Sequence, residues 1–448
     1  MTTPSHHFVQ VTGEDFTVNG EKIVFRGFGL GSWMNLEHFM IGLPGTDTMI
    51  KQAFADVYGQ ERSHAFFDRF LMEFVDERDF EFLKKLGVNH IRIPFNYKYF
   101  IDDQNPHEYR NEGFKYLDHI VALCEKYEIY GILDLHSVPG GQNPDWHCDT
   151  SSGLPLFWEY GALRDTVIGL WGHIANYYKN QPWIAAYDIV NEPSMVTNAV
   201  VFNEFYRKVI AEIRKYDSRH IIFIEGNAFT TDFSMIDPIE DPQVAYEFHF
   251  YPFVAEPAVL THEMERARRK EIFAEEFHRL ITIREKYKRP IWCGELGLVF
   301  EKEDIDFQMT IIEDMLELCE QNDVSWALWT YKDAATMGIV YPRAETPWRQ
   351  LTDSIRQVWN QHKEQEKGEA LVDYMAGTYF KPISVEQRYP LQFRMRTIMQ
   401  VICVEQNLKP FLEQLSWEEI YELPKSFHWE QCEHWSELAA VIVRYTNA

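Results

Sequence analysis

The sequence predicts an α/β fold in which eight parallel strands, each followed by a helix, close into a (β/α)8 TIM barrel. Two observations predict it. Eight apolar runs recur between residues 24 and 331, with helical patterns between them. Each run is apolar throughout rather than alternating with polar residues, as expected for parallel strands that are buried on both faces. An open dinucleotide-binding sheet is disfavoured because no GxGxxG motif follows a strand.

The predicted strands follow one another at a spacing that leaves room for a helix after each. Several of the helical patterns between them end in glycine or in a turn rich in lysine and arginine, which are helix stop signals. Eight strands alternating with helices are the number that closes a barrel. The strands are expected at residues 24–30, 88–95, 130–136, 185–193, 220–226, 244–251, 290–297 and 324–331.

Two stretches exceed a minimal barrel. Residues 31–75 form a long insertion after strand 1, on the side where a barrel carries its active site. Residues 366–448 follow the last barrel helix and read as helical, with a capping box at Ser416 and Glu419. No linker rich in Ser, Gly or Pro separates them, so we expect a catalytic barrel of residues 1–365 with a C-terminal helical extension packed on it. The extension either covers barrel surface or joins copies of the chain in a homo-oligomer.

Composition and charge restrict the function classes. The formal net charge of −26 argues against nucleic acid and anionic membranes as partners, because phosphate binding needs clustered Lys and Arg. It is compatible with a neutral partner such as an oligosaccharide. The six cysteines are far apart and form no CxxC pair, so we expect reduced thiols. The first residues do not read as a secretory signal, and no stretch approaches the roughly 20 apolar residues of a membrane span. We therefore expect a soluble, cytoplasmic protein.

Polar and aromatic side chains end six of the eight predicted strands. Chemistry in a barrel enzyme sits at the C-terminal ends of the strands. One such residue is unremarkable, since a loop begins there, but six strand ends that converge on one mouth indicate an active site. In chain order the residues are Arg92, His136, Asn191, Glu192, His249, Tyr251, Glu295 and Trp329.

Two of these residues, Glu192 and Glu295, carry the predicted chemistry. Glycoside hydrolysis needs one carboxyl group that protonates the leaving oxygen and another that meets the oxocarbenium-like centre. Glu192 ends the fourth predicted strand and Glu295 the seventh, so they face each other across the barrel mouth. At a separation of about 5–5.5 Å the second carboxylate attacks directly and the anomeric configuration is retained. Repulsion between the two like charges is expected to raise one pKa and to keep Glu192 protonated.

The neighbouring strand-end residues fit supporting roles. Arg92 can hold Glu295 ionised through a charge-assisted hydrogen bond, and Tyr251 can do the same through its hydroxyl. Asn191 can bind the sugar 2-hydroxyl, where hydrogen bonds strengthen in the transition state. Trp329 offers a flat apolar face to a sugar ring.

Each of these residues also has a plain structural explanation. An isolated Asn-Glu-Pro is only a strand-to-turn transition, and a single histidine is more often a satisfied core residue. A zinc site can be imagined from four residues of one segment, His136, His147, Cys148 and Asp149. Structural zinc sites carry tighter CxxC or HxxxH spacing, so we expect no metal and no other cofactor.

These motifs resemble glycoside hydrolase family 5, the cellulase-like branch of the retaining (β/α)8 glycosidases. The resemblance runs from about residue 18 to residue 350 and rests on RGFGLGSWMNLE, IRIPF, DLHSVPGGQN, IVNEP, HFY, GELG and WALWTY. It implies that Glu192 is the acid/base and Glu295 the nucleophile. It further implies that the subsite of the cleaved sugar is lined by Arg92, His136, Asn191, His249, Tyr251 and Trp329.

Two segments resemble the exo-acting members of that family, such as exo-1,3-glucanases. They are residues 31–37, which include Trp33 and Glu37, and residues 136–143, which end at Asn143. The resemblance implies that Glu37 binds hydroxyls of the terminal non-reducing sugar and closes the cleft into a pocket, with Trp33 and Asn143 in the same site. The residues after Glu37 lack the Trp of those glucanases and look closer to intracellular bacterial β-mannosidases that act on short oligosaccharides.

The sequence therefore favours an exo-acting retaining β-glycosidase of short β-linked oligosaccharides, with a β-mannosidase preferred. An exo-β-glucosidase or exo-β-1,3-glucanase is one alternative, and an endo-β-1,4-glucanase with an open cleft is another. A sugar-binding pseudoenzyme is the non-enzyme alternative, and the presence of both carboxylates argues against it.

Overall fold

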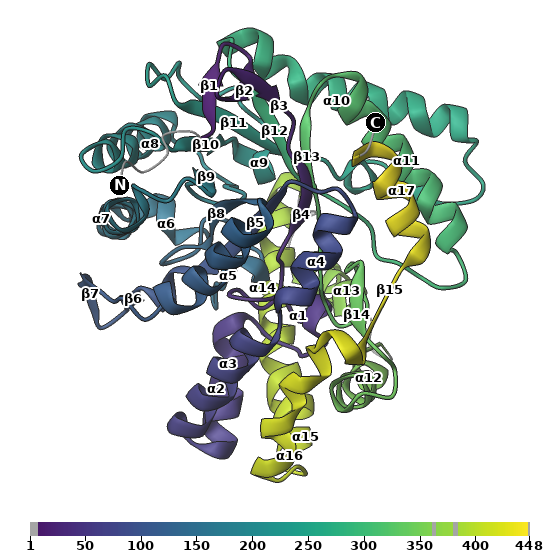
Figure 1. Ribbon diagram of the computed structural model, residues 1–448. Helices are drawn as coiled ribbons and strands as arrows, with labels where there is room; N and C mark the ends of the chain where they lie inside the picture. The colour runs from purple at the N-terminus through teal and green to yellow at the C-terminus, as the bar shows by residue number, and fades with distance from the viewer. Residues whose placement is uncertain (1–7, 361–363, 380–383, 447–448) are drawn as a thin grey trace.

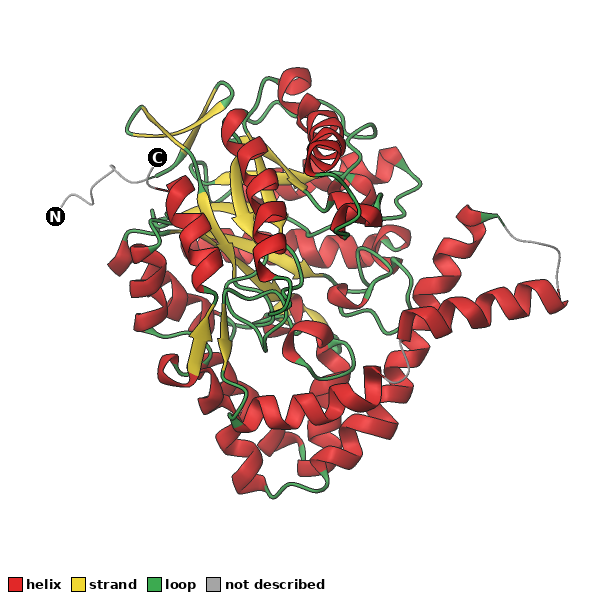
Figure 2. Ribbon diagram, turned by 90° about the vertical axis from the view of Figure 1, so that its right-hand side faces the viewer, coloured by secondary structure: helices red, strands yellow, loops and turns green. Residues whose placement is uncertain are grey.

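The core of the molecule is a closed barrel of eight parallel strands enclosed by helices, which confirms the predicted fold class (Figure 1, Figure 2). The computed structural model describes residues 8–360, 364–379 and 384–446. The strands pair in chain order, and the last pairs with the first to close the barrel. They are β4 (Arg26–Gly29), β5 (His90–Asn96), β8 (Tyr130–Ser137), β9 (Ile184–Asp188), β10 (Ile221–Glu225), β11 (Val244–His249), β12 (Ile291–Leu296) and β13 (Ser325–Leu328).

Helices cover the outside of the barrel and explain why its strands are apolar on both faces. Seven of the eight strands are followed by a helix of two turns or more. The exception is β10, after which the chain makes only the single-turn helix α9 (Asn227–Thr230). The other seven are α4 (Glu77–Lys85), α5 (Phe114–Tyr127), α7 (Gly161–Tyr178), α8 (Ala199–Arg214), α10 (Arg266–Tyr287), α11 (Ile305–Gln321) and α12 (Pro347–Asn360).

A small antiparallel sheet closes the N-terminal end of the barrel. It consists of β1 (Gln10–Thr12), β2 (Asp15–Val18) and β3 (Glu21–Ile23). Its buried Phe16 lies 5.8 Å, between ring centroids, from Phe223 of the barrel interior. Because this end is filled with apolar side chains, the opposite end of the barrel is the one that remains for ligands.

The insertion after β4 folds into three helices, α1 (His38–Ile41), α2 (Asp47–Tyr58) and α3 (Gln60–Glu73). Helices α2 and α3 lie beside α15 (Lys409–Leu412) and α16 (Trp417–Glu422) of the C-terminal extension (Figure 1). The Tyr58 hydroxyl donates to the carbonyl oxygen of Leu415 at 3.1 Å. The two additions to the barrel therefore pack against each other.

The C-terminal extension is helical where the structure describes it. The capping box predicted from Ser416 and Glu419 is formed at the start of α16. Strand β15 (Cys432–His434) pairs with β14 (Val340–Pro342), and α17 (Ser436–Thr446) packs on barrel helix α11. The remaining elements are α13 (Glu364–Tyr379), α14 (Val385–Cys403), the π-helical turn Val404–Leu408 and the 3-10 turns Leu423–Phe427 and Trp429–Gln431. A division into two units at residues 365 and 366 stays a prediction.

Within the three described ranges, no helix combines the length and the apolarity that a bilayer crossing requires.

Candidate active site

A cavity of about 1910 Å³ opens at the C-terminal ends of the barrel strands. Three parts of the chain line it. The strand ends contribute Glu192, His249, Tyr251, Glu295 and Trp329, the insertion contributes Glu37, and the extension contributes side chains of α14. Ligand pockets are commonly about 300–1,000 Å³, so this cavity has room for more than one sugar.

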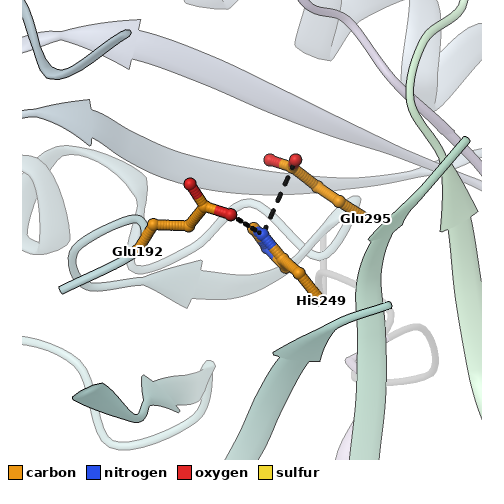
Figure 3. Close-up of side chains that lie close together, drawn as sticks. All are labelled: Glu192, His249 and Glu295. Carbon is orange, nitrogen blue, oxygen red and sulfur yellow. Dashed lines mark hydrogen bonds and ion pairs between the residues drawn. The ribbon is translucent and has the colours of Figure 1, made fainter. Parts of the chain in front are cut away.

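The two candidate catalytic carboxylates meet in this cavity, on either side of His249 (Figure 3). The Nδ1 atom of His249 lies 2.7 Å from Glu192 Oε1 and 3.6 Å from Glu295 Oε2. One oxygen of Glu192 and one of Glu295 lie within 4.8 Å of each other. Carboxyl groups about 5–5.5 Å apart leave no room for an intervening water, so this spacing favours direct attack and retention.

Glu295 ends β12 and is surrounded by hydrogen-bond donors. The guanidinium Nη1 of Arg92 donates to Oε1, and the hydroxyl of Tyr251 donates to Oε2 at 3.0 Å. Arg92 is fully buried, and its Nη2 atom also donates to Asn191 Oδ1 at 2.7 Å. These contacts fix the orientation of the Glu295 carboxylate and favour its ionised form.

Glu192 lies beyond its strand rather than on it. Strand β9 ends at Asp188, and Glu192 follows on a turn with a left-handed φ of 49°. Its amide N–H donates to Glu225 Oε2 at 2.6 Å, and its own Oε2 lies 3.1 Å from His147 Nε2. The strained backbone is held by these partners and turns the carboxylate toward the cavity.

The protonation of the pair differs from the sequence-based expectation. Burial raises the pKa of Glu295 to about 7, although Arg92 opposes the rise. Burial also acts to raise the pKa of Glu192, but His249 and His147 outweigh it and hold that pKa below its ordinary value. The His147 pKa, lowered by burial, is raised overall to about 9 by Glu192. These directions favour Glu295 over Glu192 as the carrier of the proton in the empty site, which is opposite to the sequence-based expectation.

The cavity has a flat apolar floor next to the pair, and a buried amide donor lies behind its lining. The indole of Trp329 stacks on the ring of His136, with centroids 5.3 Å apart and planes 8° apart. Gly29 and Gly31 lie against the same indole, and a Cβ at either position would approach it to 2.5 and 2.7 Å, respectively. The Nδ2 atom of Asn191 is buried and has no acceptor among the described residues, so it can donate to a sugar hydroxyl.

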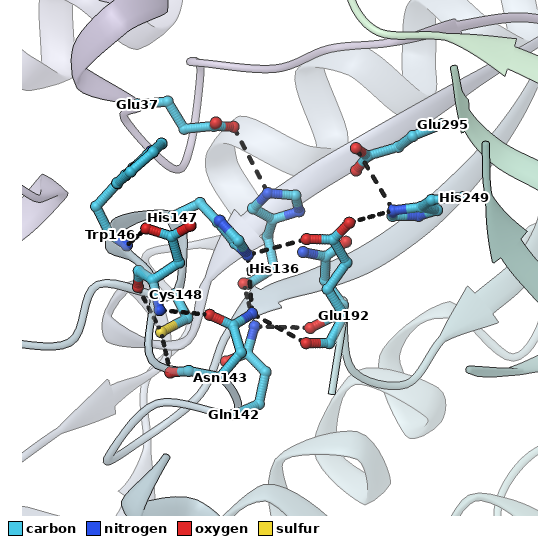
Figure 4. Close-up of polar contacts among 12 residues, drawn as sticks. Glu37, His136, Gln142, Asn143, Trp146, His147, Cys148, Glu192, His249 and Glu295 are labelled. Carbon is cyan, nitrogen blue, oxygen red and sulfur yellow. Dashed lines mark hydrogen bonds and ion pairs between the residues drawn. The ribbon is translucent and has the colours of Figure 1, made fainter. Parts of the chain in front are cut away.

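Glu37 forms the wall opposite Glu192, with His136 between them (Figure 4). Its Oε1 atom is buried, lies 3.6 Å from His136 Nε2, and makes no hydrogen bond within the part of the chain that is described. Burial raises the pKa of the Glu37 carboxyl. A buried carboxylate oxygen without a hydrogen bond is costly, so this atom is placed to accept from a hydroxyl of a ligand.

Five residues predicted to bind substrate are absent from the cavity lining, namely Trp33, Arg92, His136, Asn143 and Asn191, and two of them have their polar side-chain atoms engaged elsewhere. Trp33 is 1% exposed, lies in the core and donates from its indole N–H to the carbonyl oxygen of Leu71 at 2.8 Å. Asn143 is fully buried, and its Nδ2 donates to the carbonyl oxygen of Glu192 at 2.9 Å. Asn143 acts instead by fixing the turn that carries Glu192.

His147 and helix α14 are among the contributors to the cavity that the sequence did not predict. His147 was considered only as a metal ligand, whereas its ring contacts the Glu192 carboxylate. Helix α14 contributes Tyr389, Phe393 and Arg396. Position 147 lies in the loop that follows the DLHSVPGGQN motif, which is the one signal that could have indicated it. No local pattern marks the α14 residues, because their contact with the site is made over a long sequence separation.

Closely spaced ligand-type atoms occur in two groups within the described ranges. One is Glu192, His249 and Glu295, and the other is Glu225, Glu247 and His249. The first is the candidate catalytic pair with its bridging histidine. The second lies in the barrel core beneath the cavity, where Gly294 leaves room for the Glu247 carboxyl. The four residues considered above as zinc ligands form neither group.

Comparisons with known proteins agree with this geometry. A family model described as "Cellulase (glycosyl hydrolase family 5)" matches residues 55–335. A β-xylosidase of Phanerodontia chrysosporium is 38% identical over 349 residues, which are 74% of this chain and 72% of the relative. Endoglucanase C of Acetivibrio thermocellus is 26% identical over 297 residues, which are 58% of this chain and 84% of the relative.

A solved structure shows the same fold. It is Thermotoga maritima Cel5A in complex with mannotriose, with a TM-score of 0.53 and 18% sequence identity. The similarity covers 71% of this chain and 92% of the other.

Proposed function

Because the chain belongs to glycosyl hydrolase family 5, a family of retaining glycoside hydrolases, we propose that it is an exo-acting β-glycosidase. It removes one terminal sugar from short β-linked oligosaccharides and other small β-glycosides. Glu192 acts as acid/base and Glu295 as nucleophile. The observation that carries the proposal is the meeting of these two carboxylates, with oxygens within 4.8 Å, in a cavity whose lining also includes Glu37.

The first step forms a covalent glycosyl-enzyme. In the reactive form the proton of the pair is on Glu192 and Glu295 is ionised, with its negative charge stabilised by the donors Arg92 and Tyr251. The Glu295 carboxylate attacks the anomeric carbon as the bond to the leaving oxygen breaks. Glu192 gives its proton to that oxygen, and the aglycone leaves as an alcohol.

The second step releases the sugar. Once Glu295 is esterified its negative charge is gone, and Glu192, now ionised, is the remaining base. It takes a proton from water, whose oxygen attacks the anomeric carbon and displaces the Glu295 carboxylate. The hydrogen bond available from Asn191 Nδ2 supports the sugar 2-hydroxyl in both transition states.

Exo action is supported by the rigid wall around Glu37. The carbonyl oxygen of Phe39 accepts from Thr336 Oγ1 at 2.9 Å, and that of Met40 accepts from the amide of Ala334 at 2.8 Å. These bonds tie the insertion next to Glu37 to the loop after β13. A chain of sugars cannot continue past a wall of this kind, so one terminal sugar is bound there.

Our first candidates for the terminal sugar are β-linked xylose and β-linked glucose. The relative with 38% identity is named a β-xylosidase, and xylose and glucose share the equatorial C2 hydroxyl. A β-mannosidase, favoured by the segment after Glu37, remains the second candidate.

The test is a screen of 4-nitrophenyl β-xyloside, β-glucoside and β-mannoside, followed by product analysis on a β-linked oligosaccharide labelled at its reducing end. The proposal predicts turnover of at least one aryl glycoside and release of monosaccharide alone. Products of intermediate length at early times would favour the endo-acting alternative. Sugar binding without any turnover would favour the pseudoenzyme.

Two further expectations belong to the same proposal. A cytoplasmic site of action is supported by the six cysteines, all of which are free thiols in the structure. Association of copies through the C-terminal helices is supported by apolar side chains that α13 and α14 expose, among them Leu371, Tyr374, Ile398 and Ile402. Cell fractionation tests the first, and light scattering at several protein concentrations tests the second.

A further inference from the structure

The side of the cavity where the leaving group must stand is built from aromatic rings. The acid/base carboxylate stands next to the leaving oxygen, so the aglycone lies on the Glu192 side. The ring of Phe229 lies 6.1 Å from that of Phe393, which in turn lies 4.9 Å from that of Tyr389. We call these three residues, Phe229, Tyr389 and Phe393, the aromatic wall. All three line the cavity.

Phe229 is held at this place by an unusual backbone. Ala228, Phe229 and Thr230 have φ angles of 55°, 55° and 54°, a left-handed conformation that residues with a Cβ rarely adopt, least of all in succession. The amide of Phe229 donates to the carbonyl oxygen of Pro193, directly after Glu192, at 3.0 Å. The Thr230 hydroxyl donates to the carbonyl oxygen of Glu247 at 2.9 Å. Strain of this kind persists where the surroundings enforce it, commonly at ligand-binding sites.

Helix α14 is anchored to the active-site loops, so the other two rings are also held. The guanidinium of Arg396 lies over the Trp146 ring, 5.4 Å from its centroid, and 3.6 Å from Asp145 Oδ2. The Gln400 side chain accepts from the amide of Gly45 in the insertion at 2.6 Å. The backbone of the helix packs so closely on Gly153 that a Cβ there would lie 2.9 Å from it.

Three exposed apolar side chains also line the cavity, together with charged side chains such as Glu276, Arg279 and Glu301. Val254, Leu260 and Val299 line the cavity and are 76%, 40% and 49% exposed. These side chains offer apolar contact and no hydrogen bonds, whereas a sugar at the same place would need partners for its hydroxyls. Exposed apolar side chains gathered at a cavity mouth mark a surface that binds something apolar.

We infer that helix α14 of the C-terminal extension completes an aglycone subsite, and that this subsite selects β-glycosides of bulky apolar alcohols over those of small alcohols. The inference rests on the proposed function and adds the class of leaving group to it. The extension thereby acts in substrate selection, with Phe393 as its central specificity-determining residue.

The test compares n-octyl and methyl β-glycosides of the sugar that the aryl glycoside screen selects. Their leaving alcohols are similarly basic, so the comparison isolates apolar contact from the chemistry of bond cleavage. In the wild type kcat/KM should be about 100-fold higher for the octyl glycoside, the effect of burying about three to four methylenes. Phe393→Ala should reduce this ratio about tenfold or more and leave the methyl glycoside unaffected.

Three controls keep the result interpretable. Ile398→Ala removes an apolar side chain of the same helix that is 49% exposed and outside the cavity lining, and it should leave the ratio unchanged. Phe393→Leu keeps most of the apolar surface and should retain most of the ratio. Thermal midpoints of all variants show whether the helix remains folded.

The outcomes separate this inference from the proposed function. A wild-type octyl-to-methyl ratio of kcat/KM near one would overturn the aglycone subsite and leave the glycosidase function intact. An equal loss of kcat/KM on both substrates in Phe393→Ala would do the same. If no glycoside is turned over, the subsite is tested by binding instead. Calorimetry then compares n-octyl with methyl β-thioxyloside, neither of which is hydrolysed. Tighter binding of the octyl compound that is lost in Phe393→Ala supports the subsite, and equal binding overturns it.

Discussion

Glu37 offers the sharpest test of the pocket that underlies exo action. Its carboxyl lines the cavity, is buried, and has an Oε1 atom without a hydrogen bond in the described ranges. If it accepts from hydroxyls of a terminal sugar, each charge-assisted bond contributes about 1.5–3 kcal/mol. Loss of one bond at the low end is about tenfold in kcat/KM, and loss of two is about 150-fold. We therefore expect Glu37→Ala to lower kcat/KM between about 10- and 150-fold.

The same substitution should not destabilise the protein. A buried polar atom left without a partner costs about 1–3 kcal/mol, and removing Glu37 relieves that cost in the empty enzyme. The thermal midpoint of Glu37→Ala should stay unchanged or rise. Glu37→Gln, which keeps the shape and loses the charge, should fall between Glu37→Ala and the wild type in kcat/KM.

Asp79 provides a matched control, because it is an equally buried carboxylate outside the cavity. Its Oδ1 atom lies 2.6 Å from the buried Nζ of Lys332. Breaking a buried ion pair costs about 3–5 kcal/mol, so Asp79→Asn should lower the thermal midpoint and spare kcat/KM of the folded enzyme. Initial rates on the best aryl glycoside and differential scanning fluorimetry measure both quantities. An unchanged kcat/KM in folded Glu37→Ala would refute the closed pocket and favour an open cleft.

Three further predictions address the catalytic pair. Glu192→Ala should lower the rate mildly on aryl glycosides with good leaving groups and severely on alkyl glycosides, and added azide should restore turnover. An equal loss of rate on both substrate types would contradict the assignment of Glu192 as the acid. In pH profiles of the wild type, kcat/KM should fall as the pH rises above about 7, because the pair then loses the one proton that the acid step needs, which the free enzyme holds on Glu295 with a pKa raised to about 7; a rate that stays level up to pH 9 contradicts this. Chelators of zinc and magnesium should leave the rate unchanged, since two carboxylates suffice for the reaction. A loss of activity that one added metal ion reverses would show that the reaction needs a metal.

The barrel and most of its site were predictable from sequence because both follow from local patterns. Strands buried on both faces are apolar throughout, and the residue that ends such a strand must face the barrel mouth. His249 and Glu295 therefore lie where the strand ends place them, whereas Arg92 lies near the start of β5 and reaches Glu295 with its long side chain. The same rule misplaced the end of the fourth strand, which stops at Asp188, although Glu192 still reaches the cavity through a left-handed turn.

The rest depends on contacts that no local pattern encodes. Trp33 was expected in the site as a motif neighbour of Glu37, but its indole N–H finds a carbonyl partner in the core. The protonation of Glu192 depends on His147, whose ring reaches it from a loop. The aromatic wall joins residues 229 and 393, which only the packed extension brings together.

The most direct test of the central claim is to trap the glycosyl-enzyme. A 2-deoxy-2-fluoro β-glycosyl fluoride of the preferred sugar slows both steps but has a good leaving group, so the covalent intermediate should accumulate. Intact-protein mass spectrometry should show one equivalent of fluorosugar, and peptide mapping should place it on Glu295. The Glu295→Gln variant should show no adduct. A label on Glu192 or any other residue, or an adduct that survives in Glu295→Gln, would contradict the assignment of Glu295 as the nucleophile.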